Sequence, residues 1–154
     1  MTNNDILRRL RYAFDFTDEK MMYLFESGGR KTPREHVSDW LKKEEDPDVK
    51  TLEDVELAMF LNGFINDRRG KKEGPQPAPE TSLSNNVILR KLKIALNLKD
   101  DDILRILELT GRDVSKHEIS AFFRHPEQNQ YRVCKDQILR NFIQGLQITY
   151  RVNG

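Results

Sequence analysis

The sequence predicts an all-α protein, built as a tandem duplication of a four-helix unit joined by a Pro-rich linker. Three observations support this fold class. The chain of 154 residues repeats itself without a gap. Its apolar residues recur at the spacing of three and four that is typical of amphipathic helices. No stretch alternates apolar and polar residues as a half-buried strand would. We therefore expect two copies of one helical unit.

The two copies begin with the same motif. NNDILRRLRYAF occupies Asn3–Phe14, and NNVILRKLKIAL follows 82 residues later at Asn85–Leu96. This period is longer than that of the helical solenoid repeats, which predicts two domain-sized copies. We place the first four-helix repeat at residues 3–70, a linker with three prolines at 71–84, and the second four-helix repeat at 85–152.

The first two helices of each copy have recognisable start and stop signals. The Asn pairs that begin at Asn3 and Asn85 are predicted N-caps, because an Asn side-chain oxygen accepts hydrogen bonds from the first-turn amides. Acidic residues such as Asp100 open the second helix, where they complement the helix dipole. Gly29 and Gly111 are expected to end that helix in a left-handed conformation.

The third and fourth helices follow after these glycines. TPRE, at Thr32–Glu35, matches a capping box with proline in the first helical position. SKHE, at Ser115–Glu118, is its counterpart in the second copy and is slipped by one residue. Gly63 and Gly145 lie inside the predicted fourth helix, where glycine lowers helix propensity. We therefore expect a neighbouring helix to approach closely at both glycines.

Composition limits the cellular setting and the partners. The net charge of +1 does not indicate nucleic acid or an anionic membrane as the partner of the whole chain. The single cysteine, Cys134, cannot form an internal disulfide and is expected to be a buried thiol. No apolar signal region follows Met1, and no run reaches about 18 apolar residues. These features predict a cytoplasmic protein without a membrane partner.

The charges are unevenly divided between the copies. Residues 3–70 carry 12 basic and 15 acidic residues, whereas residues 85–154 carry 12 basic and 8 acidic residues. An acidic copy and a basic copy attract each other, within one chain or between two chains. The division is therefore compatible with a homodimer.

The order of motifs along the chain resembles one known family. NNDILRRLRYAF, LKKEEDPD, FLNGFINDRRGK and NNVILRKLKIALNLKDDDIL together resemble the YehS-like family. This family consists of small, two-repeat bacterial proteins that carry a domain of unknown function. The resemblance covers almost the whole chain and implies a bacterial, cytosolic, all-α protein. It implies no activity, cofactor or catalytic residue.

Basic residues supply the candidate binding surface. One cluster lies near the start of each repeat, where its side chains are available to contact phosphates or an acidic partner. The segment Asp101–Arg124 also resembles a helix-turn-helix, although its turn, Gly111–Ser115, is longer than the usual three or four residues. The candidate partner or nucleic-acid surface comprises Arg8, Arg9, Arg11, Arg90, Lys91, Lys93, Arg112, Lys116, His117 and Arg124.

The sequence lacks the motifs of common enzymes. It has no phosphate-binding glycine loop, no Gly-x-Ser-x-Gly elbow and no Cys/His metal spacing, so we expect no catalysis, cofactor or metal. The leading hypothesis is a non-enzymatic protein that binds a protein partner, or itself as a homodimer. Tyr12, Tyr23 and Tyr150 are candidates to line a groove between the copies. The alternative hypothesis is a DNA- or RNA-binding regulator that uses the helix-turn-helix-like segment of the basic second repeat.

Overall fold

The computed structural model describes residues 1–151, and this part of the chain contains eight helices and no strand. The all-α fold class and its tandem four-helix units are therefore confirmed. The helices are α1 (Asn3–Phe14), α2 (Asp18–Ser27), α3 (Arg34–Leu41), α4 (Asp54–Arg69), α5 (Asn85–Ala95), α6 (Asp100–Glu108), α7 (Lys116–Phe122) and α8 (Asp136–Tyr150).

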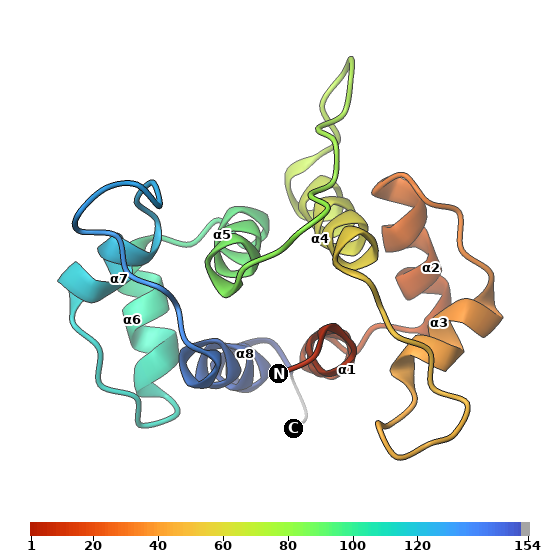
Figure 1. Cartoon of the computed structure of the whole chain (residues 1–154), viewed down its shortest axis with the longest axis horizontal. Helices are drawn as coiled ribbons and strands as arrows, with labels where there is room; N and C mark the ends of the chain where they lie inside the picture. The colour runs from red at the N-terminus through yellow and green to blue at the C-terminus, as the bar shows by residue number, and fades with distance from the viewer. Residues whose placement is uncertain (152–154) are drawn as a thin grey trace.

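The two repeats are arranged around an approximate two-fold axis (Figure 1). Helices α1, α4, α5 and α8 form the centre, with α2 and α3 on one flank and α6 and α7 on the other. A rotation of 180° about this axis superimposes α1 on the position of α5, and α4 on the position of α8. The first helix of each repeat packs along the last helix of the other repeat, so α1 contacts α8 and α4 contacts α5.

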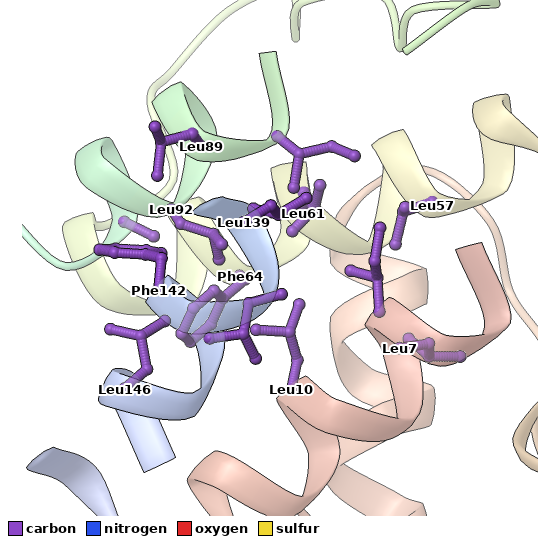
Figure 2. Close-up of a cluster of buried hydrophobic side chains, with 14 of the residues drawn as sticks. Leu7, Leu10, Leu57, Leu61, Phe64, Leu89, Leu92, Leu139, Phe142 and Leu146 are labelled. Atoms are coloured by element: carbon purple, nitrogen blue, oxygen red, sulfur yellow. The ribbon is translucent and has the colours of Figure 1, made fainter. Parts of the chain in front are cut away.

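The repeats share one hydrophobic core. A single cluster of buried side chains continues from the first repeat into the second. Figure 2 shows its centre, where side chains from all four central helices meet. The labelled residues are Leu7, Leu10, Leu57, Leu61, Phe64, Leu89, Leu92, Leu139, Phe142 and Leu146. Burial of apolar surface is the dominant favourable term in folding, so this cluster makes the two repeats stabilise each other.

Two helical glycines permit close packing on each flank. A Cβ atom at Gly63 would overlap the backbone carbonyl of Leu24 in α2, and one at Gly145 would overlap the carbonyl of Ile106 in α6. Helices α2 and α4 therefore touch through their backbones, as do α6 and α8. The predicted close approach is confirmed at both positions.

The Asn pairs have a different role from the predicted one. The N-caps are Thr2 for α1 and Ser84 for α5, so the prediction of Asn caps was wrong. The Asn4 side chain is buried and donates to the carbonyls of Trp40 (3.0 Å) and Lys50 (2.7 Å). Its oxygen accepts from the amide of Leu52 (3.0 Å). Asn4 therefore fastens the loop between α3 and α4 to the first helix.

The second repeat contains the same anchor. Asn86 donates to the carbonyls of Phe122 (3.0 Å) and Arg132 (2.7 Å), and its oxygen accepts from the amide of Cys134 (2.9 Å). These partners lie 36 to 48 residues away in sequence. The second Asn of the duplicated motif therefore makes the same long-range bonds in both repeats and caps neither helix.

The predicted capping box is incomplete in both third helices, and only one of them has a side-chain cap. Ser115 caps α7 by accepting from the amide of Glu118 (3.1 Å), as predicted. In the first repeat, Pro33 occupies the cap position without a side-chain bond, while Thr32 is buried and donates to the carbonyl of Arg30 (3.1 Å). Both helices start at equivalent positions, so the predicted slip of one residue was wrong.

No helix in the described residues is long and apolar enough to cross a membrane.

Candidate functional site

A hollow of about 570 Å³ lies where the two repeats meet on one side of the centre. We call it the α4/α5 groove. The second half of α4, the outer face of α5 and the linker form its walls. In Figure 1 the linker rises from the end of α4, turns, and descends to the start of α5. The helices supply Asn62, Ile65, Asn66, Arg69, Val87, Arg90, Lys91 and Ile94, the α4 C-cap supplies Gly70, and the linker supplies Lys72, Gln76, Pro77, Ala78 and Glu80.

The charge of the groove is strongly one-sided. Its lining contains four cations, Arg69, Lys72, Arg90 and Lys91, but one carboxylate, that of Glu80. Cations at the end of α4 are favoured there because they complement the negative end of the helix dipole. A low-dielectric wall concentrates the field of such charges and raises the local concentration of anions. The groove is therefore suited to a negatively charged ligand.

The cations differ in how firmly they are held. The Lys91 ammonium lies 2.9 Å from the Glu80 carboxylate and donates to Asn62 (2.6 Å), and its side chain is only 11% exposed. Arg90 makes one long hydrogen bond, 3.4 Å, to the carbonyl of Phe123. Arg69 has no carboxylate within 4.0 Å in the described part of the chain. Arg69 and Arg90 are thus available to a ligand.

Apolar side chains lie between these cations. Ile65 and Val87 are half-buried in the lining, and Ile94 is 45% exposed. An exposed isoleucine beside a basic rim provides an apolar contact for a ligand that is not purely ionic. The groove therefore fits a ligand with both carboxylate and apolar groups.

A second hollow of about 380 Å³ extends the groove along α5. It shares Arg69, Arg90 and Ile94 with the groove and adds Lys93 and Phe123. The Lys93 ammonium lies 4.1 Å from the centre of the Phe123 ring and 2.9 Å from the Asp100 carboxylate. Lys93 is therefore already neutralised, whereas the shared residues continue the open basic surface.

Three predicted surface residues lie in or beside the groove. Arg90 and Lys91 line it, and Lys93 lies in its extension. Sequence reasoning missed Arg69 and Lys72. They belong to the run RRGKK at residues 68–72, which was a visible signal at the end of the first repeat.

The basic cluster of α1 lies elsewhere and is largely neutralised. Arg8 pairs with Asp5 and donates to the carbonyl of Lys42 (2.7 Å), and Arg11 lies 3.6 Å from Asp18. A hollow of about 310 Å³ beside α1 is lined by three cations and three carboxylates. Arg9 is exposed in that hollow, so its charge is balanced by its surroundings.

The helix-turn-helix-like segment does not form one open basic face. Lys116 lies 3.1 Å from the Asp101 carboxylate, and Arg124 donates to the side chain of Gln130 (2.6 Å). Arg112 and His117 are exposed. None of these four residues lines the α4/α5 groove.

The three tyrosines that were expected to line a groove between the copies do not line this one. Tyr12 is exposed on α1 and Tyr23 on α2, while the Tyr150 ring packs 5.1 Å from the Phe14 ring. The prediction failed because it did not include the path of the linker. Lining residues come from α4, α5 and the linker, and none of them is aromatic.

Cys134 is not available as a reactive group. Its side chain is buried in the shared core at the position equivalent to Leu52. Burial, with a smaller contribution from the nearby Asp136 carboxylate, raises the pKa of the Cys134 thiol to about 12. The thiol therefore stays protonated at neutral pH, which suppresses nucleophilic and metal-binding chemistry because both need the thiolate. Within the described residues, no group of three His, Cys, Asp or Glu side chains is placed to hold a metal ion.

Fold and groove together define a class: two-repeat helical proteins with a shared core and a basic groove at the repeat junction. The model of the family described as "Protein of unknown function (DUF1456)" matches this chain twice, at residues 3–70 and 85–151. The chain therefore belongs to the DUF1456 family. It is similar to the uncharacterized protein YehS of Escherichia coli (strain K12), with 40% identity over 147 residues, which cover 95% of this chain and 94% of that protein. No solved structure matches the chain.

Proposed function

We propose that this protein is a non-enzymatic, cytoplasmic binding protein that holds an acidic segment of a protein partner in the α4/α5 groove. The observation that carries the proposal is the charge of the lining, where four cations face one carboxylate. Complementary charge raises the association rate and excludes partners of the wrong sign.

The apolar part of the groove favours a protein segment over nucleic acid. Proteins that bind single strands usually stack the bases on aromatic side chains. The groove instead offers Ile65, Val87 and Ile94, which suit an aliphatic side chain of a peptide. Phe123, in the adjoining hollow, is covered by the Lys93 ammonium. The proposal is therefore a peptide with carboxylates and at least one apolar anchor.

Site-specific crosslinking in cells tests the proposal. A photo-reactive amino acid replaces Ile94 in the groove or, as control, Tyr12 at the equivalent position of α1. The two positions are matched, because Ile94 is 45% exposed and Tyr12 is 46% exposed. We expect a protein adduct from position 94 and none from position 12. Equal amounts of adduct from positions 94 and 12 would show that the partner does not bind specifically at the α4/α5 groove.

Charge reversal separates specific binding from general attraction. The double variant Arg69→Glu/Arg90→Glu should abolish the adduct and lower the affinity for the purified partner fragment by on the order of tenfold or more. The control Arg9→Glu/Arg112→Glu changes the net charge by the same amount as Arg69→Glu/Arg90→Glu, but at exposed positions outside the groove. Equal loss in both double variants would contradict a specific site.

The nature of the adduct distinguishes the alternatives. An adduct of twice the chain mass means that a second copy of this protein is the partner. An adduct that disappears after nuclease treatment means that the DNA- or RNA-binding hypothesis is correct. In that case the affinity for duplex DNA should fall with salt by about 0.9 log units per log unit of salt for each phosphate contact.

A further inference from the structure

The linker forms one wall of the groove as well as connecting the repeats. Gln76, Pro77, Ala78 and Glu80 form part of the lining, and Glu80 supplies its single carboxylate. Pro77 also lies beside Ile65 in a smaller hollow of about 60 Å³ on the α4 side of the groove. A short segment of this chain with prolines and a carboxylate therefore already lies against the basic and apolar walls.

The contacts of this segment show which ligand chemistry the groove accepts. The Glu80 carboxylate lies 2.9 Å from the Lys91 ammonium, which also donates to Asn62 (2.6 Å). Prolines keep a peptide extended and lower the entropy that it loses on binding. A partner with the same features would meet the same cation and the same apolar wall.

The segment is held weakly enough to be displaced. Residues 71–78 are exposed, and the Gln76 side chain bonds only to the carbonyls of Lys72 (2.8 Å) and Gly74 (3.1 Å), inside the linker itself. The Glu80 oxygen nearest Lys91 is buried but accepts no hydrogen bond, so this ion pair is the one polar contact that the described residues show between residues 71–80 and the helices. After Glu80, the amide of Leu83 donates to Asp54 (2.8 Å), which fixes the end of the linker independently of the groove.

We propose that the partner segment is extended, acidic and proline-containing, and that it displaces residues 76–80 of the linker, which form one wall of the groove in the free protein. This inference rests on the proposed function. In the complex, a carboxylate of the partner replaces Glu80 at Lys91, and Arg69 and Arg90 bind further carboxylates that the linker does not provide. The free protein therefore binds its partner less tightly than a protein with an uncovered groove would.

The test uses two labelled decapeptides as probes, one of alternating Glu and Pro and one of alternating Glu and Ala, which have the same charge. Their affinities are measured by fluorescence anisotropy at low ionic strength for the full-length protein and for the Glu80→Gln variant. We expect the Glu-Pro probe to bind more tightly than the Glu-Ala probe. We expect Glu80→Gln to tighten binding about two- to fivefold, the range set by loss of a partly exposed ion pair.

Glu73→Gln is the matched control. It removes the same charge from the same linker, but Glu73 is exposed and does not line the groove. Equal tightening by Glu73→Gln and Glu80→Gln would mean that only net charge matters, and would overturn the competition. Weaker binding by Glu80→Gln would show that Glu80 supports the ligand instead of competing with it. Equal binding of the two probes would overturn the preference for proline.

A charge-reversed chain separates this inference from the proposed function. Suppose that the probes bind the wild type, that Arg69→Glu/Arg90→Glu abolishes this binding, and that Glu80→Gln leaves the affinity unchanged. The groove is then still the binding site, but the proposed competition by the linker is wrong. If neither probe binds the wild type or Glu80→Gln, both the groove and the competition are overturned.

Discussion

The α4/α5 groove and the α1/α8 face occupy equivalent places in the two-fold arrangement but carry different side chains. Val87 and Ile94 of α5 correspond to Asp5 and Tyr12 of α1, and Arg69 of α4 corresponds to Arg151 after α8. Arg69 faces the open groove, whereas the Arg151 guanidinium lies 3.8 Å from the centre of the Tyr12 ring. The same scaffold therefore presents an open basic surface on one side and a self-covered one on the other.

The linker adds to this difference. It joins α4 to α5 and forms one wall of the groove, whereas in residues 1–151 the α1/α8 face is covered by side chains of its own helices and by Arg151. On that side the Arg151 guanidinium donates to the carbonyl of Tyr12 (2.6 Å) and lies 3.5 Å from the Asp15 carboxylate. A duplication with equivalent packing has thus produced unlike surfaces through a few side chains and one connection.

The largest expected difference between the repeats lies at the helical glycines. A Cβ at Gly63 would lie 1.7 Å from the carbonyl oxygen of Leu24, whereas one at Gly145 would lie 2.4 Å from that of Ile106, so the overlap is more severe at Gly63. Gly63→Ala should lower the free energy of unfolding by about 3 kcal/mol or more, and Gly145→Ala by about 2 kcal/mol. Urea denaturation of both variants measures this, with Lys71→Ala, in the exposed linker, as a control for the handling of the variants. Equal losses would mean that the flanks are packed equally tightly.

The anchoring asparagines Asn4 and Asn86, in contrast, should contribute equally to the free energy of unfolding. Asn4→Ala and Asn86→Ala each remove three hydrogen bonds of matching geometry, so each should cost about 3 kcal/mol at about 1 kcal/mol per bond. Because the core is shared, each variant should still unfold in one cooperative transition, followed by circular dichroism and by Trp40 fluorescence. Two separate transitions would show that the repeats unfold independently.

The smallest effect comes from exchanging one equivalent residue. Val87→Asp copies Asp5 into the groove, and we expect it to weaken binding of an acidic peptide by on the order of tenfold through like-charge repulsion. The same carboxylate sits three residues after the Ser84 cap, so it should stabilise α5 by about 0.5 kcal/mol. Anisotropy and thermal unfolding measure the two effects. Asp5→Val is the reciprocal control and should leave binding unchanged.

Local signals in the sequence were sufficient for the helices but not for their long-range partners. Apolar spacing and the ungapped repeat predicted the fold class, and Gly63 was correctly assigned to a close approach. Asn4 was misread as a cap because an asparagine at a helix start satisfies the capping preference. Its actual partners, from Trp40 to Leu52, are brought to it only by the path of the loop.

The groove was predictable only in part for the same reason. Arg90 and Lys91 were identified from the charge of one helix. Arg69 and Lys72 join them only because α4 packs along α5 and the linker turns back across both. Neither the shared core nor this path is encoded in the periodicity of a single segment.

The exchange of partners between first and last helices has an evolutionary consequence. Two separate copies of one four-helix unit, packed in this arrangement, would form a homodimer in which every substitution appears twice, once on each face. Fusion into one chain removes that constraint, because a change at residue 94 leaves residue 12 as it was. The α4/α5 groove and the α1/α8 face were thereby free to differ in charge and apolar character, as residues 94 and 12 do.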